Sequence, residues 1–560
     1  MNPGASTLSE STQNLKPFLK SITLGGFQVF DKITTIPLGH ITLLYGPNSA
    51  GKSSVEDGLE LFNRTINSLD GKWADNPELL KHWRKRSSNR HDLSPTMTLG
   101  VSADLDINLG GCIAGTLRFV DNFHSTSSKE SHDCSVLLTY KLIEIDEYDE
   151  TPRFDIGISI SVDGQELLRL ETLDDNSNRA GVNYLHPLLK SAPLKHNYSA
   201  LPAEYSKWLT FEDGWIWIQT QLIFFEKDHG FSHGYGIISP ESIISSIRVH
   251  DAESYKTLSN ENDLQDILNE TLDYFNTSKL LVLNNIASTP HTVSASRKVP
   301  SPGDLTIGLI PSNYEADSPF LSLLDNHNSQ YWPLAKSYFQ QNHQVPYYEK
   351  QPGLDDLFKK VNNALSDHLF LDRGYQLIAK CHLVIGLEDF DNLLVTPDNS
   401  QSNYPVIVQL NLIDAQGRTY TFEDVGSGLG YVLPILTSIF NDYVSISLLQ
   451  QPELHLHPAL QAAIGDVFID ASHKNHQLII ETHSEHILLR VLKRIRQSSR
   501  LDNSATSLSI NPNDVSVVYF DSKLDGTTDV KRLRISPDGD FLDLWPRGFF
   551  AERDQELFGE

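Results

Sequence analysis

The octapeptide Gly46-Pro-Asn-Ser-Ala-Gly51-Lys52-Ser53 decides the fold of this chain. It follows the apolar run Ile41-Thr-Leu-Leu-Tyr45, which predicts a β-strand, and it precedes apolar residues that recur at the helical period from Val55 onward. The eight residues fit the pattern G-x-x-x-x-G-K-[ST] in the strand, loop and helix context that this pattern requires. A glycine-rich loop is therefore expected to join a buried strand to a helix N-terminus.

A loop of this kind has the chemistry needed to bind phosphate. Its glycines let backbone N–H groups turn toward phosphate oxygens, and the helix N-terminus adds a partial positive charge. Lys52 supplies an ammonium group, and Ser53 offers a hydroxyl to Mg²⁺. Against the alternative of a chance glycine-rich turn, the intact context favours nucleotide binding.

Composition limits the class of protein. The 560 residues include 45 Lys plus Arg and 72 Asp plus Glu, and the formal net charge of −27 argues against a protein that coats DNA through its bulk charge. Cys112, Cys134 and Cys381 lie far apart, which predicts reduced thiols rather than disulfides or a zinc site. No apolar run is long enough to span a bilayer, and Met1–Gln13 is polar. We expect a cytoplasmic protein with no membrane partner.

The middle of the chain divides into a β-rich part and a part with weaker patterns. Between 97 and 173, runs of strand-forming residues alternate with turn residues and predict an antiparallel sheet. These runs are 98–107, 112–120, 135–145 and 154–162. The stretch 174–350 mixes aromatic residues with Ser, Asn and Pro loops and predicts one helix, near 263–275.

Polar clusters in the last third of the chain follow predicted strands. A loop with three glycines, 424–434, leads into an apolar helix, although a plain turn is an alternative reading of this loop. The strand 445–449 runs into Gln450-Gln-Pro-Glu453, and the strand 477–480 delivers Glu481-Thr-His-Ser-Glu-His486. Ligand sites of open α/β sheets lie at the carboxyl ends of strands, so these clusters are expected to converge on one site.

Together these motifs resemble the ABC-type, SMC/RecF/OLD-like branch of the AAA-family ATPases. The resemblance covers both ends of the chain: a phosphate loop GPNSAGKSS, a signature loop VGSGLGYVLP, a Walker B strand ending QQPELHLHP and a switch strand ending ETHSEH. The closing sequence DGDFLDLWPRGFFAERDQELF is similar to bacterial ATPases with a WPxGFF tail. Among these are the ATPase components of Septu-type and retron-associated anti-phage defence systems.

The resemblance implies an α/β fold of the ABC ATPase head type. Such a head contains a P-loop parallel sheet flanked by helices and an antiparallel β subdomain, and here it is expected to carry a large mixed α/β insertion. The expected parts are a flexible leader (1–16), an N-terminal ATPase lobe with the P-loop and the antiparallel subdomain (17–173), an inserted domain of unknown role (174–350), a C-terminal ATPase lobe with the signature, Walker B and switch motifs (351–510), and a C-terminal strand with the WPRGFF tail (511–560).

The resemblance also assigns roles to residues. His483 is expected to contact the γ-phosphate, with an ordinary strand-end histidine as the alternative, while Ser427 and Gly428 reach a nucleotide bound by a second subunit. The implied assembly is a head-to-tail homodimer, or a higher homo-oligomer, with ATP and Mg²⁺ at the interface. The residues expected to bind the nucleotide within one subunit are Gly46, Pro47, Asn48, Ser49, Ala50, Gly51, Lys52, Ser53 and Ser54.

One departure from the family pattern concerns catalysis. Where these ATPases usually carry an acidic Mg²⁺ ligand and a catalytic glutamate, this chain has Gln450 and Gln451. With Ser53, Gln450 can coordinate the metal weakly, and Gln451 can orient water. An amide cannot accept a proton as a carboxylate does, so general-base catalysis worth roughly 10²–10⁴-fold is lost. Glu453 is a candidate substitute, with Glu481 and Glu485 as other candidates, and loop or helix caps are the alternative role of these glutamates. We expect slow hydrolysis to ADP and phosphate.

These features predict a nucleotide-gated regulator. About 60 residues follow the switch helix, too few for a nuclease domain on the usual domain size. The tail residues Asp538, Asp540 and Asp543 fit turn chemistry better than a metal cluster. We therefore expect an effector nuclease in trans, of HNH type, and a reverse transcriptase with its RNA/DNA as a further candidate partner. The alternative is a RecF-like DNA-repair ATPase that clamps DNA.

Two basic clusters and a group of histidines complete the candidates. Lys81, Arg84, Lys85, Arg86 and Arg90 surround Trp83 and predict nucleic-acid or partner binding. A second cluster at 490–496 is better explained as the solvated face of an amphipathic helix. The histidines at 455, 457, 483 and 486 are expected to be loop residues near the dimer interface, with a zinc site as the alternative.

Overall fold

A computed structural model describes most of both ends of the chain. Two compact units form, Met1–Thr35 with Gly58–Ser288 and Ile36–Asp57 with Thr289–Glu560. The described residues are 18–67, 79–84, 96–107, 130–145, 152–172, 178–187, 209–219, 266–268, 282, 286, 290–297, 306–307, 331–342, 354, 356–370, 374–383, 406–422, 424–425, 428–474, 476–500 and 508–546.

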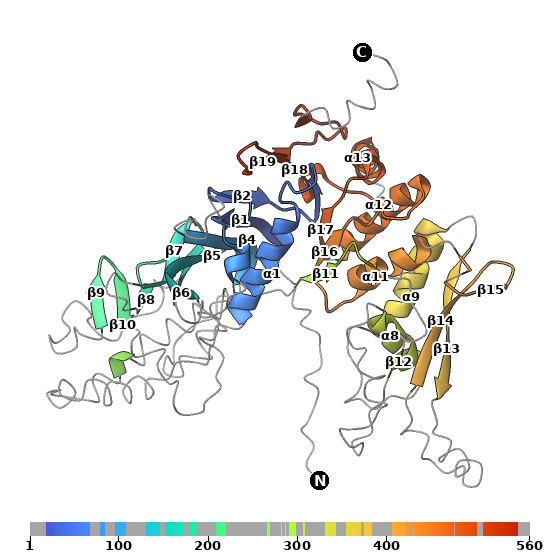
Figure 1. The fold of residues 1–560 in the computed structure, drawn as a ribbon, viewed down its shortest axis with the longest axis horizontal. Helices are drawn as coiled ribbons and strands as arrows, with labels where there is room; N and C mark the ends of the chain where they lie inside the picture. The colour runs from blue at the N-terminus through green and yellow to red at the C-terminus, as the bar shows by residue number, and fades with distance from the viewer. Residues whose placement is uncertain are drawn as a thin grey trace, which may run out of the picture. The chain divides into compact units, whose positions relative to one another are not determined.

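A six-stranded sheet of order β11-β16-β17-β3-β18-β19 is the framework of the second unit (Figure 1). Neighbouring strands are parallel except for the antiparallel pair β18 and β19. The strands are β11 (His291–Val293), β16 (Ile446–Gln450), β17 (Gln477–Glu481), β3 (Ile41–Tyr45), β18 (Val515–Ser522) and β19 (Thr528–Leu533), and the 3₁₀ turn η10 (Pro512–Asp514) precedes β18. The carboxyl ends of β16, β17, β3 and β18 therefore lie along one edge of the sheet.

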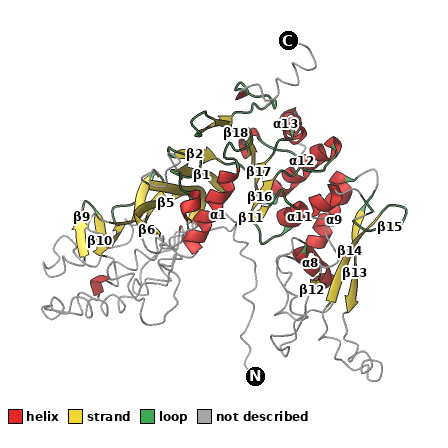
Figure 2. Ribbon diagram, in the orientation of Figure 1, coloured by secondary structure: helices red, strands yellow, loops and turns green. Residues whose placement is uncertain are grey.

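Continuous burial explains why the central strands are mostly apolar. Every residue of β3 and β17 is buried, and so is every residue of β16 before Gln450. Parallel strands that are covered on both faces read as unbroken apolar runs. Three helices pack here: α11 (Gly428–Phe440) against β16, α12 (Pro458–His473) against β17 and β3, and α13 (Glu485–Arg500) against α12 (Figure 2).

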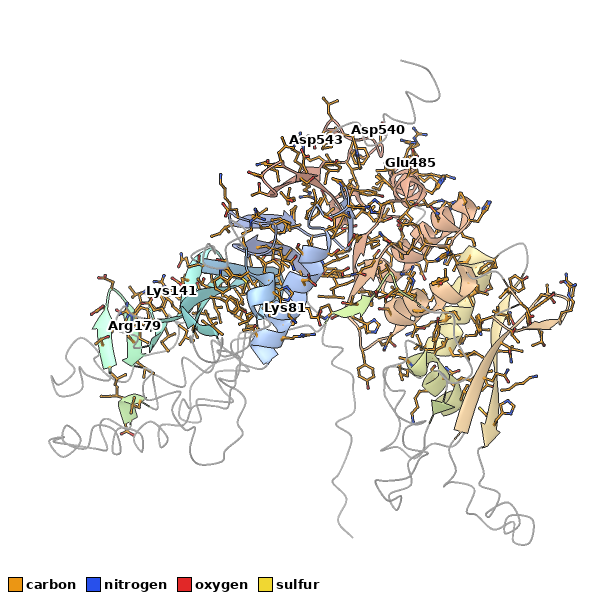
Figure 3. All side chains as sticks on the ribbon, viewed as in Figure 1. Lys81, Lys141, Arg179, Glu485, Asp540 and Asp543 are labelled. Carbon is orange, nitrogen blue, oxygen red and sulfur yellow. The ribbon has the colours of Figure 1, made fainter. Side chains whose placement is uncertain are left out.

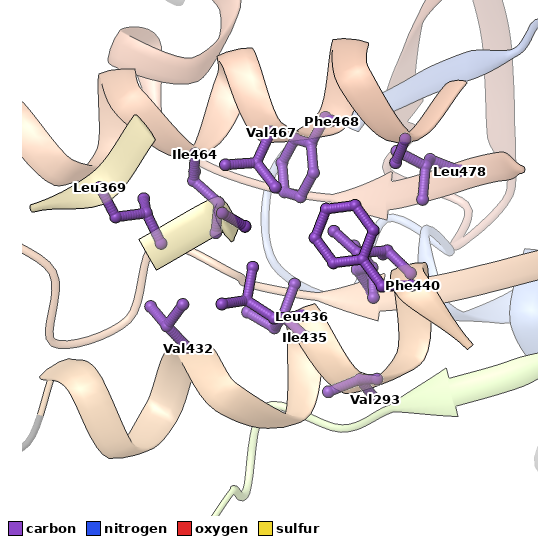
Figure 4. Close-up of a cluster of buried hydrophobic side chains, with 14 of the residues drawn as sticks. Val293, Leu369, Val432, Ile435, Leu436, Phe440, Ile464, Val467, Phe468 and Leu478 are labelled. Carbon is purple, nitrogen blue, oxygen red and sulfur yellow. The ribbon is translucent and has the colours of Figure 1, made fainter. Parts of the chain in front are cut away.

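Side chains of α11 and α12 meet to form a core beside this sheet. Figure 4 shows Val432, Leu436 and Phe440 of α11 facing Ile464 and Phe468 of α12. None of these five side chains is more than 3% exposed. Burying an apolar side chain of this size stabilises the fold by about 1.5–3 kcal/mol. The packing holds together the two helices that follow the predicted signature and Walker B loops.

A smaller antiparallel sheet also belongs to the second unit. Its order is β12-β14-β13, and β15 pairs with β14. Helix α8 packs against β12, β13 and β14. These elements are β12 (Thr306–Ile307), α8 (Trp332–Asn342), α9 (Leu357–Ala364), the π-helical turn η8 (Leu365–Leu369), β13 (Gln376–Leu383), β14 (Val406–Ile413) and β15 (Thr419–Tyr420).

A nine-stranded sheet of order β2-β1-β4-β5-β6-β7-β8-β10-β9 forms the first unit. The side chains of Cys134, Val136, Leu138 and Tyr140 in β5 alternate with less buried residues, as expected for a sheet with one covered face. Helix α1 begins at Ser53, and its later residue Thr65 hydrogen-bonds Tyr140 at 2.7 Å. The elements are β1 (Leu19–Gly25), β2 (Thr34–Pro37), α1 (Ser53–Asn67), α2 (Leu79–His82), β4 (Thr96–Ile107), β5 (Glu130–Ile145), β6 (Pro152–Val162), β7 (Gln165–Thr172), β8 (Asn178–Asn183), β9 (Leu209–Glu212) and β10 (Trp215–Gln219).

The expected fold class is confirmed: an α/β chain with a P-loop parallel sheet, flanking helices and an antiparallel β sheet. The runs 98–107, 135–145 and 154–162 lie within β4, β5 and β6, whereas 112–120 lies outside the described residues. Within the stretch 174–350, strands β8 to β10 extend the nine-stranded sheet and β11 joins the parallel sheet. The domain boundaries stay a prediction. Among the described residues, no helix combines the length and the hydropathy that a membrane crossing requires.

Candidate functional site

The predicted phosphate loop begins where β3 ends. Gly46 has φ of +145° and Gly51 has φ of +93°, backbone conformations that favour glycine. A Cβ atom on Gly46 would lie 2.5 Å from the carbonyl oxygen of Phe520 in β18. On the far side of the loop, Thr528 donates a hydrogen bond to the carbonyl of Ala50 over 2.8 Å. The strands β18 and β19, which lie from residue 515 onward in the sequence, therefore contact the loop and restrict its conformation.

Lys52 lies at the centre of this loop. Its ammonium donates hydrogen bonds to the carbonyls of Gly46 and Pro47, each at 3.0 Å, and the residue is 3% exposed. Burial lowers the pKa of Lys52, and the negative charge of Glu481 opposes this shift. The carboxylate lies 3.7 Å from the ammonium. The loop thus holds a cation between its own carbonyls and a carboxylate from β17.

The remaining loop residues divide between exposed and buried positions. Asn48, Ser49 and Ser53 are exposed, while Ala50 and Ser54 are buried. The hydroxyl of Ser53 donates a hydrogen bond to Glu481 Oε2 over 2.8 Å. The predicted loop residues thus come together at the edge of the sheet, and Glu481 joins them.

Gln450 ends β16 with both polar atoms of its side chain engaged. Its Oε1 accepts a hydrogen bond from the backbone N–H of Ala295 over 3.1 Å, and its Nε2 donates to Glu56 over 2.5 Å. Glu56 is buried in the first turn of α1. Gln451 follows with φ of +43° and donates its backbone N–H to the carbonyl of Glu481 over 2.7 Å. Two adjacent strand ends are therefore tied together here.

A buried arginine supports the same strand end. Arg297, four residues past β11, is 3% exposed and donates to the carbonyl of Gln450 over 2.8 Å and to that of Gln451 over 2.9 Å. It also donates to the carbonyl of Ser294 over 3.1 Å. Burial lowers the pKa of this guanidinium, and the charge of Glu453 opposes the shift. Backbone carbonyls, rather than a carboxylate, are the groups that fix this cation.

Glu453 contacts the switch segment. Its Oε1 accepts the backbone N–H of His483 over 2.7 Å, and its Oε2 accepts the hydroxyl of Thr482 over 2.8 Å. Burial lowers the pKa of His483, with a further lowering by the charge of Lys52, so the imidazole is favoured in its neutral form. Glu453 therefore links the loop after β16 to the loop after β17.

The signature segment is described in part. Gly428 starts α11, and a Cβ atom on it would lie 2.8 Å from the carbonyl oxygen of His455. Tyr431 stacks on the His455 ring, with centroids 4.5 Å apart. Ser427 lies outside the described residues. The glycine allows the start of α11 to approach the loop after β16.

The histidines near this loop do not form a metal cluster. His457 caps α12, since its Nδ1 accepts the backbone N–H of Ala459 over 3.3 Å. No group of three or more His, Cys, Asp or Glu side chains with a geometry suited to a metal ion occurs in the described part of the chain.

The first basic cluster is partly structural. Lys81 is exposed (Figure 3), whereas Arg84 donates to the carbonyl of Gln28 over 3.1 Å. Trp83 is 2% exposed, so it is not available to stack on a base as the sequence pattern suggested. Lys85, Arg86 and Arg90 lie outside the described residues. The binding role of this cluster stays a prediction.

Charged side chains around α13 pair within the chain. Arg490 and Arg494 both contact the buried carboxylate of Asp466 at 2.7 Å. In the tail, Asp540 pairs with Arg496 and Asp543 with Arg534, both aspartates being visible in Figure 3. The hydrogen bond from Arg534 lowers the pKa of Asp543 to about 2. These pairs explain Arg490, Arg494 and Arg496 of the second basic cluster, and Asp540 and Asp543 of the tail, as structural.

Most of the chain matches a known family. A family model described as an AAA ATPase domain matches residues 18–488, from β1 to α13. The chain belongs to the AAA ATPase domain family. Membership of this AAA ATPase family implies nucleotide binding and ATPase activity, and typically Mg²⁺. The donors around Ser53 fit that metal, because a hydroxyl and a carboxylate are oxygen ligands of the kind that Mg²⁺ prefers. Bound Mg²⁺ supplies positive charge to the phosphates.

Solved structures similar to this AAA ATPase include SMC heads. One is an Smc head bound to the C-winged helix domain of ScpA, with 10% identity, 93% of this chain and 98% of that chain covered, and a TM-score of 0.39. A second, from Pyrococcus furiosus, is bound to the C-terminal domain of ScpA, with 13% identity, 92% and 96% covered, and a TM-score of 0.36. A third is from Thermotoga maritima, with 9% identity, 92% and 99% covered, and a TM-score of 0.33. No curated protein matches the chain.

Sequence reasoning missed two residues of the candidate site in this AAA ATPase. Glu56 follows Val55 on the buried stripe of α1, and a carboxylate within an apolar stripe is a signal that could have identified it. Arg297 follows a strand of three residues, β11, which gives too little periodicity to recognise. Its position beside Gln450 depends on the pairing of β11 with β16.

Proposed function

We propose that this AAA ATPase is a slow, nucleotide-gated switch that regulates a partner nuclease in anti-phage defence. In this proposal ATP binds at the loop 46–54, and two copies sandwich it, with Ser427 and Gly428 of each copy reaching the nucleotide of the other. The shared edge of β16, β17 and β3 supports a single composite site, because it brings Gln450 and Glu481 next to the loop.

The observation that carries the proposal is the pair of amides at the end of β16. Gln450 is held by Ala295 and Glu56, and its oxygen is neither charged nor basic. Without a carboxylate at 450 or 451, this strand end cannot remove a proton from water. The loss of such a general base lowers the rate of hydrolysis by roughly 10²–10⁴-fold. An ATPase that turns over slowly keeps its ATP-bound state for long periods, which suits a switch better than a motor.

The contacts of Glu453 support communication between the nucleotide and the rest of the protein. This carboxylate accepts hydrogen bonds from Thr482 and from the backbone of His483. A ligand that displaces His483 must therefore shift or break a charge-assisted hydrogen bond. The loop after β16 includes His455, which packs against the start of α11, so the change can reach the expected dimer interface.

The regulatory and defence parts of the proposal rest on sequence. The ion pairs of Asp540 with Arg496 and of Asp543 with Arg534 support a structural role for these tail aspartates, and we propose that the nuclease is a separate protein. The WPRGFF tail and the ETHSEH switch resemble defence ATPases, so we propose an HNH-type nuclease as the partner, and a reverse transcriptase with its RNA/DNA as a further component.

Two measurements test the switch. The purified chain is expected to form dimers in ATP and monomers in ADP by light scattering, and to hydrolyse ATP at well below the ~10 s⁻¹ of an average enzyme. Rapid turnover of the isolated protein, at rates typical of enzymes, would contradict the switch.

The partner is tested by co-expression with an HNH-type nuclease, where one is encoded beside this gene in its host. Degradation of DNA by the complex is expected to change between ATP and ADP, and the Lys52→Ala variant is expected to lose this dependence. If the nuclease is indifferent to the ATPase, and the chain alone binds duplex DNA with strong salt dependence, a RecF-like clamp replaces the regulator.

A further inference from the structure

Glu481 lies where a magnesium ligand is needed, although it belongs to a different strand from the usual one. It is the last residue of β17 and is 9% exposed. Its Oε2 accepts the hydrogen bond of the Ser53 hydroxyl over 2.8 Å, and its Oε1 lies 3.7 Å from the Lys52 ammonium. The carboxylate therefore contacts the two loop residues that end the phosphate motif.

Gln450, the residue expected to provide the metal ligand, makes other hydrogen bonds with its side chain. Gln450 and Glu481 are direct partners in the parallel register of β16 and β17. The Gln450 oxygen already accepts from Ala295, and its nitrogen donates to Glu56. The buried carboxylate of Glu56 favours an amide at 450, because a second carboxylate there would add like charge in a buried site. A carboxylate can instead lie at the end of the neighbouring strand β17, where Glu481 is found.

We propose that Glu481 supplies the carboxylate ligand for the Mg²⁺ that accompanies ATP, with Ser53 as the second protein ligand. Mg²⁺ usually binds proteins through one or two side chains together with substrate phosphates and water, so two such groups suffice. This inference rests on the nucleotide binding that the family implies, and it replaces Gln450 by Glu481 in the expected ligand set.

A simpler role for Glu481 is to neutralise the charge of Lys52. Both roles predict that its loss changes ATP binding, but they differ in how the change in affinity depends on the metal. A ligand acts only when Mg²⁺ is present. A group that merely balances Lys52 acts on nucleotide binding in the presence or absence of the metal.

The experiment measures the affinity of the full chain for a fluorescent ATP analogue, first in EDTA and then across a Mg²⁺ titration. For Glu481→Gln, the Mg²⁺ concentration at half-saturation is expected to rise by roughly 10–100-fold, the usual cost of a disrupted metal site. Its affinity in EDTA is expected to stay within about 3-fold of the native value, a change of under 1 kcal/mol. Binding in EDTA also shows that the variant is folded. Mn²⁺ in place of Mg²⁺ allows the metal to be followed directly by electron paramagnetic resonance.

Asp521→Asn is the matched control. Asp521 lies on β18, which pairs with β3 on the side opposite β17. It follows two residues after Tyr519, and Tyr519 is the direct partner of Tyr45 in β3. The Asp521 carboxylate pairs with Lys531 at 3.6 Å. This substitution removes the same charge from the same edge, and the Mg²⁺ dependence is expected to stay native.

Three results would overturn the assignment. Equal shifts in both variants would indicate a general effect of negative potential. A changed affinity in EDTA, in either direction, with an unchanged Mg²⁺ dependence would show that Glu481 only balances Lys52. Native protein that fails to bind the analogue at all would reject nucleotide binding itself, which is a different failure from a changed metal dependence.

Discussion

The side-chain amide of Gln450 donates a hydrogen bond to the carboxylate of Glu56 over 2.5 Å. Glu56 is 5% exposed, so this contact lies within the protein. A buried carboxylate is costly unless hydrogen-bond donors surround it. The contact with Glu56 therefore favours an amide side chain at position 450. Position 451 differs, because the contacts described there are made by the backbone of Gln451 and not by its side chain.

That difference predicts unequal results when acids are introduced at the two positions. Gln451→Glu is expected to raise ATP turnover by roughly 10²-fold, because it supplies a general base near the predicted γ-phosphate. Phosphate release at saturating ATP measures this change. Gln497→Glu, the same replacement on the exposed face of α13, is expected to leave turnover unchanged. An unaltered rate in Gln451→Glu would mean that another residue already acts as the base.

Gln450→Asp is expected to behave in the opposite way. It removes the amide donor and places a second carboxylate near Glu56, so the free energy of unfolding should fall by about 1–3 kcal/mol. Urea denaturation measures the loss. Combining it with Glu56→Gln should recover most of the stability, since the like-charge contact is then gone. Additive losses in the double variant would show that the two side chains do not interact.

Lys52→Ala is expected to weaken ATP binding by at least ~100-fold, or about 2.7 kcal/mol, because the loop loses its only ammonium. Titration with a fluorescent ATP analogue measures the affinity. Lys523→Ala removes the same charge from an exposed pair with Asp529 and should bind ATP as the native protein does. Native affinity in Lys52→Ala would reject the assignment of the loop.

Arg297→Ala is expected to destabilise the protein by about 3 kcal/mol, because the carbonyls of Gln450 and Gln451 lose a buried donor. Arg297→Lys should lose less, since its ammonium can still reach one carbonyl. Chemical denaturation measures both. Arg64→Ala breaks an exposed pair with Glu60 and should cost no more than about 0.5 kcal/mol. A loss in Arg297→Ala as small as this would mean that water replaces the guanidinium.

Stability is expected to depend on pH through His186. This residue is 1% exposed, and burial lowers its pKa. The unfolded chain then binds the proton more readily than the folded one. The contribution of neutral His186 to stability is therefore fully present above the ordinary histidine pKa of about 6.5, and it is lost as pH falls through the lower pKa of the folded state. Denaturation at pH 7.5 and pH 5 measures the difference.

The matched variants for this prediction are His186→Asn and His382→Asn. The first should reduce the pH dependence, because the buried titrating group is gone. The second changes an exposed histidine on β13 and should retain it. Identical pH profiles for native protein and His186→Asn would contradict the prediction.

Local sequence patterns predicted the elements that carry the phosphate loop. The apolar run at 41–45 coincides with β3, and the helical spacing after Ser53 coincides with the start of α1. The strand predicted at 477–480 is β17, which continues one residue further to Glu481. These predictions succeed because buried parallel strands and glycine loops leave their signal within a few adjacent residues.

Contacts between distant segments could not be predicted in this way. Glu481 was recognised as one of several strand-end acids, but its contact with Ser53 depends on β17 lying next to β3. Arg297 reaches Gln450 only through the pairing of β11 with β16. Such neighbours follow from the order of strands in a sheet, which no single stretch of sequence encodes.

The position of β3 in its sheet has a consequence for how the protein is made. Its neighbours are β17 and β18, and Trp545 packs edge-on against Tyr45 at 5.6 Å, so all three contacts come from the last part of the chain. During translation, β3 leaves the ribosome with both hydrogen-bonding edges unpaired and waits for hundreds of residues. Products of premature termination therefore cannot assemble the nucleotide loop, and nascent chains are expected to need chaperone protection until synthesis is complete.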